Sequence, residues 1–183
     1  MENTIRRGRV WVLLDKNGKL IEDIDTDQIY HNAFLHITDI AQMGQYALGN
    51  LEGWKDFPKK CQPGDIVLTG RNFGAGSSRQ QAVDCFIALS VGMIVAPSFG
   101  AIYFRNAINS GFPVLKIRGF EELFDRRQIE TGDTVEIDFL RGTARNLSKN
   151  ASMEVEPMCS VQYDIFRAGN LFEYGKMLAQ GLS

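Results

Sequence analysis

Three short apolar segments alternate with two amphipathic segments between residues 66 and 117, and this order restricts the fold most. The apolar segments are residues 66–68, 93–96 and 113–117. Residues 82–89 between them carry apolar side chains at helical spacing, and residues 99–109 form a second expected helix that Gly111 ends. Strands that are joined through a helix lie parallel, with right-handed crossovers. The sequence therefore predicts an α/β fold with a parallel core sheet.

The segments on either side of this core add further strands and a helical tail. Residues 10–14 are apolar enough for a strand, and residues 134–139 alternate as a half-buried strand does. Residues 153–158 are the expected antiparallel partner of residues 134–139, and residues 163–179 are expected to be helical. No repeat or linker interrupts the chain, so residues 1–183 are predicted to form one domain, a parallel core with an added β-layer.

The loop between the first core strand and its helix carries the most distinctive motif, Gly-Ala-Gly-Ser-Ser-Arg at residues 74–79. Glycines allow unusual backbone angles and close approach. Ser77 or Ser78 is a candidate N-cap of the helix, with Gly92 as the residue that follows its end. The positive end of the helix dipole and the Arg79 guanidinium would then suit a small anion such as a carboxylate. An ordinary glycine-rich turn with a serine cap explains the same local pattern, and both interpretations stay open.

Two familiar phosphate-binding motifs are excluded for this loop. A Walker A loop needs a lysine after its glycines, and none is present. The glycines also do not keep the G-x-G-x-x-G spacing of a dinucleotide-binding turn, because Arg79 stands where a third glycine is needed.

Composition excludes several other functional classes. The net charge is −2, from 20 basic and 22 acidic residues, which predicts neither nucleic-acid nor membrane-surface binding. No apolar run reaches transmembrane length, and the polar first nine residues lack a signal core, so a cytoplasmic location is expected. The cysteines Cys61, Cys85 and Cys159 are far apart and form no C-x-x-C pair, so we expect no metal or iron–sulfur site in this chain. Cys85 is expected to be a buried structural thiol.

Several segments together resemble one known family. The motif at residues 70–82 occurs with Asp-Thr-Asp-Gln-Ile at residues 25–29, and further matching segments are residues 8–11, 96–99 and 169–174. In this order they resemble the small subunits of the isopropylmalate isomerase and homoaconitase family, which correspond to the swivelling domain of aconitase. The resemblance covers nearly the whole chain. It implies a swivelling-type α/β domain layered β/β/α, with helices on one side of the parallel core sheet.

The resemblance also implies a reaction and a partner. Enzymes of this family move a hydroxyl between adjacent carbons of a malate-type acid by dehydration and rehydration. A [4Fe–4S] cluster in a separate large subunit binds the substrate, which is a small polycarboxylate. The small subunit supplies a serine base, which falls at Ser77 here, and Arg79 with Ser78 and Gly76 would contact the substrate. Because an alkoxide needs a dry site, the isolated chain is expected to be inactive.

The chain departs from the family pattern at Ala75, where cysteine or glutamate is common, and at two further places. Gln80 and Gln81 follow the arginine where an acidic residue is common, and residues 34–37 do not align with the family's substrate-selecting loop. His36 is therefore a candidate substrate contact or a plain surface residue, and residues 25–27 are expected to shape the loop entry. Isopropylmalate is the first expected substrate, with homoaconitase and dimethylmalate or citramalate dehydratase small subunits as alternatives. An anion-binding module and a purely structural subunit are the non-enzymatic alternatives.

Overall fold

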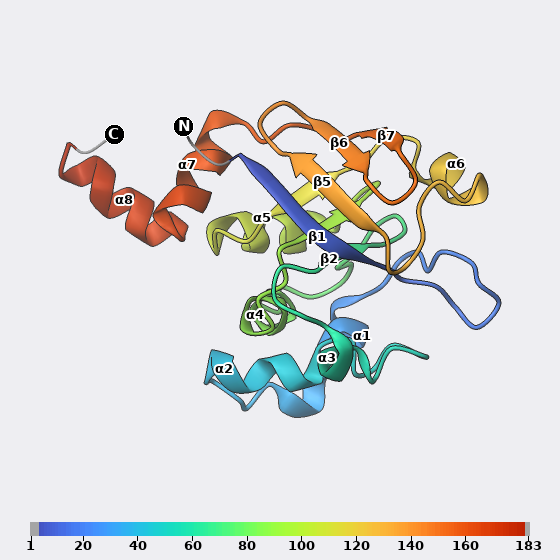
Figure 1. The fold of residues 1–183 in the computed structure, drawn as a ribbon. Coiled ribbons are helices and arrows are strands. Elements are labelled where there is room, and N and C mark those ends of the chain that lie inside the picture. Colours follow the sequence, from blue (N-terminus) through green and yellow to red (C-terminus); the bar gives the residue numbers. More distant parts are fainter. Residues whose placement is uncertain (1–3, 182–183) are drawn as a thin grey trace.

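A computed structural model describes residues 4–181 and contains one mixed sheet of seven strands (Figure 1). The strands, in chain order, are β1 (Ile5–Val12), β2 (Ile66–Leu68), β3 (Met93–Ala96), β4 (Val114–Lys116), β5 (Thr134–Asp138), β6 (Thr143–Asn146) and β7 (Ala151–Glu154). Their spatial order is β4-β3-β2-β1-β5-β6-β7. The first four strands are parallel to one another. Strand β5 pairs antiparallel with β1, and β6 and β7 continue the sheet in antiparallel order, so the predicted parallel core with added strands is confirmed.

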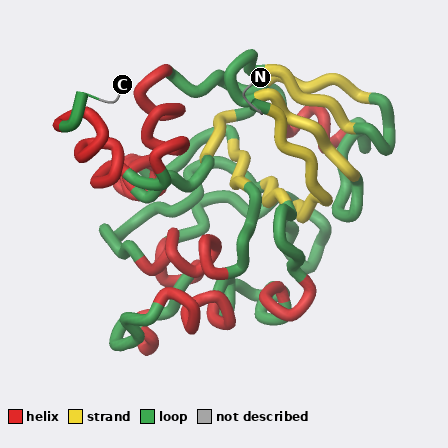
Figure 2. Tube along the Cα trace, turned by 60° about the vertical axis from the view of Figure 1, so that its left-hand side comes forward, coloured by secondary structure: helices red, strands yellow, loops and turns green. Residues whose placement is uncertain are grey.

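The long strand β1 connects the two halves of the sheet. Its last three residues, Val10 to Val12, pair with β2, whereas residues 5–9 pair with β5. Because β2 and β5 pair with different parts of β1, the antiparallel strands can curl away from the plane of the parallel strands. Figure 2 shows the strands at the upper right of the molecule, one group of helices below them, and the C-terminal helices beside them at the upper left.

Two apolar clusters cover the two faces of the parallel strands. One face of the parallel strands is covered by five helices of the described residues. They are α1 (Thr26–Ile29), α2 (Ile40–Met43), α3 (Phe57–Lys60), α4 (Gln81–Ala88) and α5 (Ala101–Asn109). There Val67 and Ile94 pack against helix residues such as Phe86. On the other face, alternate strand residues such as Leu68 and Met93 pack against β5–β7 and against α6 (Phe120–Asp125) and α7 (Ser160–Ala168). The layers are helices, parallel strands and antiparallel strands, as expected from the resemblance.

One prediction about the C-terminal half is wrong, and a second holds only in part. The segment at residues 153–158 does not pair with β5, because the shorter and more polar strand β6 lies between them. The helical tail is also not continuous: Gly169 adopts a φ of 94° and separates α7 from α8 (Leu171–Ala179). A left-handed residue ends a helix, and glycine reaches that conformation without steric cost.

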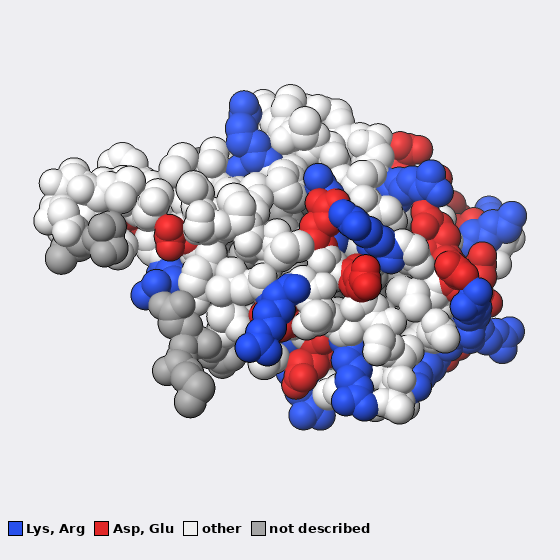
Figure 3. Space-filling model, turned by 90° about the horizontal axis from the view of Figure 1, so that it is seen from above, with Lys and Arg blue, Asp and Glu red and all other residues white. Residues whose placement is uncertain are grey.

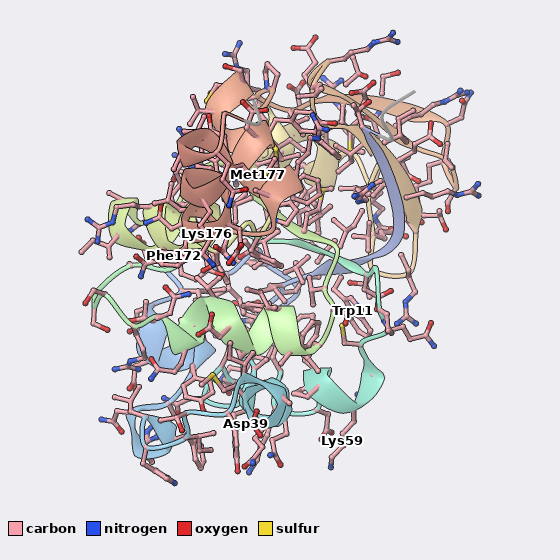
Figure 4. All side chains as sticks on the ribbon, turned by 90° about the vertical axis from the view of Figure 1, so that its left-hand side faces the viewer. Trp11, Asp39, Lys59, Phe172, Lys176 and Met177 are labelled. Atoms are coloured by element: carbon pink, nitrogen blue, oxygen red, sulfur yellow. The ribbon has the colours of Figure 1, made fainter. Side chains whose placement is uncertain are left out.

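Helix α8 projects from the body of the molecule (Figure 1) and none of its residues is buried. It exposes large apolar side chains at Leu171, Phe172, Met177 and Leu178. Figure 4 shows Phe172 and Lys176 next to each other on this helix, and the Lys176 ammonium lies 4.9 Å from the Phe172 ring centroid. Seen from above, the projecting end carries few charges, while mixed charges cover the opposite side (Figure 3). Within residues 4–181, no helix has the length and apolar character needed to cross a membrane.

Candidate active site

The glycine loop lies where the carboxyl ends of the parallel strands meet, which is the usual ligand-binding edge of such sheets. It follows β2 and is flanked by the segments that follow β1 and β3. The Gly74 N–H donates to the Ile24 carbonyl at 2.7 Å, and the Thr26 N–H donates to the Ala75 carbonyl at 2.9 Å. On the other side, Phe73 forms a parallel bridge with Phe99. Backbone hydrogen bonds therefore fix the loop between two neighbouring segments.

The backbone beyond Gly74 is open to a ligand. Gly74 and Gly76 adopt φ values of 78° and 95°, which glycine reaches without steric cost. Among residues 4–181, the N–H groups of residues 76–81 have no protein acceptor. Consecutive unpaired N–H groups ahead of a helix form a site for an anion. The anion-binding interpretation of the motif thus has a structural basis that does not depend on serine caps.

The predicted serine cap itself is wrong. Helix α4 begins at Gln81, its N-cap is Gln80, and no side chain caps it. Residues 79 and 80 are instead held from outside the helix: the Arg79 side chain bonds to the C-terminal end of α1, and the Gln80 amide bonds to Ser110 after α5. The helix also ends earlier than expected, because Ser90, with a φ of 56°, takes the place predicted for Gly92. Ser77 and Ser78 consequently keep hydroxyls that are free of a capping role.

Ser77 is exposed at the tip of the loop and has one side-chain partner in the described structure. Its Oγ lies 2.9 Å from Oγ1 of Thr26. Within residues 4–181, no histidine or carboxylate forms a hydrogen bond with the Ser77 hydroxyl, so this part of the chain does not form a Ser-His-Asp arrangement. A base at this position would have to be created by electrostatic stabilisation of the alkoxide rather than by a neighbouring general base.

Arg79 is held firmly by α1. Its Nη1 donates to the Asp27 carboxylate at 2.9 Å, to the Tyr30 carbonyl at 2.7 Å and to the Thr26 carbonyl at 3.3 Å. Its side chain is only 13% exposed. In the described part of the chain, Nη2 and Nε have no protein acceptor, so two donors remain for a carboxylate.

Asp27 is the counter-charge of this arginine. Partial burial raises the pKa of its carboxyl, but hydrogen bonds from Arg79 and from the Asn32 N–H outweigh that effect and leave the pKa below its usual value. Asp27 is therefore ionised at neutral pH and keeps the Arg79 guanidinium in place. Because this contact uses only Nη1, it orients the arginine without occupying its other two donors.

Gln80, which departs from the family pattern, connects the loop to helices α4 and α5. Its Nε2 donates to Asp84 Oδ1 and to Ser110 Oγ, both at 2.8 Å. Burial raises the pKa of the Asp84 carboxyl, against the effect of the Gln80 hydrogen bond. A glutamate at position 80 would place a second carboxylate against Asp84, so glutamine suits this neighbour. Gln80 thus has a structural partner in this chain.

The other predicted site residues are Gly76, Ser78 and His36, and the first two lie on the glycine loop. Gly76 and Ser78 are exposed on the same loop as Ser77, and the Ser78 carbonyl accepts from Asn106 of α5. His36 is exposed on the segment after Tyr30, with its Nδ1 3.0 Å from the Ala33 carbonyl. Within residues 4–181, no hydrogen bond joins His36 to the loop, so its contact with a substrate stays a prediction.

The described residues contain no group of three or more His, Cys, Asp or Glu side chains that is placed to hold a metal ion. Cys85 is fully buried on α4, and burial raises the pKa of its thiol, as expected for a structural cysteine. Cys61 is half-buried, and burial raises the pKa of that thiol to about 12.

Sequence reasoning underestimated Thr26 and Asp27, which it assigned to shaping the loop entry. Asp25 is the N-cap of α1 and forms a capping box with Gln28. The same cap turns Thr26 and Asp27 toward the glycine loop, where they meet Ser77 and Arg79. In the sequence, the sign of their role is that Thr26 and Asp27 are polar and lie between the two residues of a capping box. Their contacts with Ser77 and Arg79 become visible only in the tertiary structure.

Comparisons with known proteins agree with this architecture. Residues 56–119 match the family described as the aconitase C-terminal domain. The 3-isopropylmalate dehydratase small subunit of Caldicellulosiruptor saccharolyticus is 39% identical over 88% of this chain and 89% of its own length. That of Pyrobaculum calidifontis is 39% identical over 93% of this chain and 96% of its length. The crystal structure of 3-isopropylmalate dehydratase from Methanocaldococcus jannaschii superposes with a TM-score of 0.81 at 31% identity, covering 97% of this chain and 98% of that one.

Proposed function

This chain belongs to the family of 3-isopropylmalate dehydratase small subunits, and we propose that it is the small subunit of a heteromeric hydro-lyase that interconverts 2- and 3-isopropylmalate. This reaction is a step of leucine biosynthesis. The supporting observation is the combination of an exposed Ser77 hydroxyl, two unpaired Arg79 donors and the open N–H groups of residues 76–81. In this proposal, residues 1–183 form a single domain that acts in the cytoplasm together with a large subunit.

In the proposed reaction, Ser77 is the base. The Ser77 alkoxide takes the proton from the carbon next to the departing hydroxyl, and the C–H electron pair becomes the new C=C bond as the C–O bond breaks. A [4Fe–4S] cluster on the large subunit would supply the Lewis acid that accepts the leaving hydroxyl. Rehydration reverses these events at the adjacent carbon, and Ser77 returns the proton. Arg79 Nη2 and Nε hold a substrate carboxylate throughout.

The large subunit is needed because the site on this chain is exposed. Each unit by which the serine pKa falls requires about 1.4 kcal/mol of preferential stabilisation of the alkoxide. The loop N–H groups and Arg79 supply such stabilisation only weakly in water and far more strongly once water is excluded. Since Ser77 and Ser78 are both exposed here, a second surface has to cover them. We therefore expect the isolated chain to have no measurable dehydratase activity.

The proposal is tested by an anaerobic assay with the matching large subunit and a reconstituted cluster. Absorbance of the unsaturated intermediate is followed with and without this chain on isopropylmalate, homocitrate, dimethylmalate and citramalate. Turnover of isopropylmalate that requires both subunits supports the proposal. Turnover of a different acid alone would reassign the substrate. An inactive panel, with the complex formed and the cluster intact, would favour an anion-binding or structural subunit.

Replacing Arg79 with lysine tests its carboxylate-binding role. A lysine ammonium cannot bond to the carbonyls of α1 and also present two fixed donors to a carboxylate. We expect KM to rise about 10- to 100-fold, which corresponds to about 1.4–2.8 kcal/mol of lost binding. The matched control is Arg71→Lys at the start of the same loop, where the side chain of an exposed arginine pairs with Glu121 and Glu22 and with no other group of residues 4–181. A KM that stays at the wild-type value in the Arg79 variant would exclude this role.

A further inference from the structure

The hydroxyl of Thr26 has a single partner in the described structure, and that partner is the proposed base. Thr26 is the first residue of α1 and is 3% exposed. Its Oγ1 lies 2.9 Å from Ser77 Oγ, and no other group within residues 4–181 bonds to it. A buried hydroxyl without an alternative acceptor has its proton available for Ser77.

The position of this hydroxyl is fixed from several directions. The Thr26 N–H donates to the Ala75 carbonyl at 2.9 Å, and its own carbonyl accepts from the Tyr30 N–H at 3.0 Å and from Arg79 Nη1 at 3.3 Å. The β-branched side chain has few rotamers at χ1. Thr26 is thus joined to the glycine loop on both sides of Ser77, through Ala75 and through Arg79. Its Oγ1 cannot follow Ser77 if the serine rotates away.

The direction of the hydrogen bond depends on the charge of Ser77. When both hydroxyls are neutral, either oxygen can donate. An alkoxide has no proton and can only accept, so Thr26 Oγ1 then has to be the donor. A hydrogen bond to a charged acceptor is stronger than one to a neutral acceptor, so this contact favours the ionised form of Ser77.

We propose that Thr26 is a positioning residue for the base: it donates a hydrogen bond to Ser77 Oγ, fixes the serine rotamer and stabilises the alkoxide. The inference rests on the proposed function, in which Ser77 takes the substrate proton. Thr26 does not touch the substrate and moves no proton along the reaction path. Its effect is on the fraction of Ser77 that is ionised and correctly oriented.

Thr26→Val and Thr26→Ser, in the complete complex with the large subunit, test this proposal. Valine keeps the branched shape and removes the hydroxyl, whereas serine keeps the hydroxyl and removes the methyl group. For valine we expect a loss of about 10- to 100-fold in kcat with little change in KM, because one charge-assisted bond is lost. The rising limb of the pH–rate profile should move to higher pH, since the alkoxide has lost a donor. The Thr26→Ser variant should have a kcat and a pH–rate profile close to those of the wild type.

Two results would overturn the role of Thr26. One is a valine variant with wild-type kcat and an unshifted pH profile. The other is a serine variant that is as slow as the valine variant, which would assign the effect to the methyl group and to packing. If the valine variant does not assemble, Thr26→Ala removes the same hydroxyl with a smaller side chain and carries the same expectation.

Ser77→Ala, assayed alongside, separates this inference from the proposed function. If the base assignment is correct, kcat of the Ser77→Ala enzyme falls by about 10²- to 10⁴-fold. Adding Thr26→Val to that variant then lowers the residual kcat no further, because the two residues act through one atom. A Ser77→Ala variant that keeps full activity contradicts the base assignment itself. A Ser77→Ala variant with this loss of kcat together with an unaffected Thr26→Val variant contradicts only the role of Thr26.

Discussion

Ser77→Ala is expected to lower kcat of the assembled enzyme by about 10²- to 10⁴-fold, the range for loss of a general base. Thr26 does not replace the lost base, because its hydroxyl is buried behind Ser77. KM should change little, since Arg79 keeps its bonds to α1 and its two free donors. The measurement is anaerobic steady-state formation of the unsaturated intermediate from isopropylmalate.

The neighbouring serine provides the control. Ser78 is exposed on the same loop, and its backbone carbonyl is held by Asn106 from α5. Ser78→Ala therefore removes an identical hydroxyl one residue away and leaves the loop anchored. If Ser78 contacts the substrate, KM should rise severalfold while kcat stays near wild type. An inactive Ser78→Ala enzyme beside an active Ser77→Ala enzyme would move the base to the second serine.

The parallel core was predictable because its signals are local. Residues 66–68, 93–96 and 113–117 are short apolar runs, each followed by glycine, proline or a polar turn, and buried parallel strands have this pattern. The structure places strands inside all three runs. Their order along the chain then determined the topology, without information from distant contacts.

The errors arose where tertiary contacts decide the outcome. Strand β6, Thr-Ala-Arg-Asn, has one apolar residue and is identified as a strand only by its pairing with β5 and β7. The start of α4 is set by bonds from Arg79 to α1 and from Gln80 to Ser110, which come from segments about 30 to 50 residues away. A serine followed by a helical pattern is a local cap signal, and these distant anchors override it.

The sequence was sufficient to predict which motifs contribute to the site, but not which of their side chains contact one another. Sequence reasoning selected Ser77, Arg79 and the glycines through the family resemblance, and the loop itself explains why an anion would bind there. The pairing of Ser77 with Thr26 and of Arg79 with Asp27 joins residues that are 51 and 52 positions apart. These pairs form because the segment after β1 and the glycine loop after β2 lie side by side at one edge of the sheet. A single sequence does not specify this proximity.

Gly74→Ala is the second large effect that we expect, and it acts on stability. An ideal Cβ at Gly74 would lie 2.2 Å from Cγ and 2.5 Å from Cβ of Tyr103. Tyr103 is fully buried on α5 and packs edge-on against Phe73, with ring centroids 5.2 Å apart. Because the added Cβ would overlap a buried tyrosine, overpacking should cost about 1–3 kcal/mol. The φ of 78° adds about 1–2 kcal/mol of left-handed strain for a residue with a Cβ.

Gly18→Ala separates these two costs. Gly18 has a similar φ of 74°, but nothing lies within 4 Å of its ideal Cβ, so this variant should show the backbone strain alone. Urea denaturation of both variants gives the difference in free energy of unfolding, expected to be about 1–3 kcal/mol larger for Gly74→Ala. Gly74→Ala should also lower kcat, because Ser77 lies three residues further along the same loop, whereas Gly18→Ala should leave kcat unchanged. Equal stability of the two variants would mean that the loop can move away from Tyr103, and the rigid placement of Ser77 against Thr26 would then lose its support.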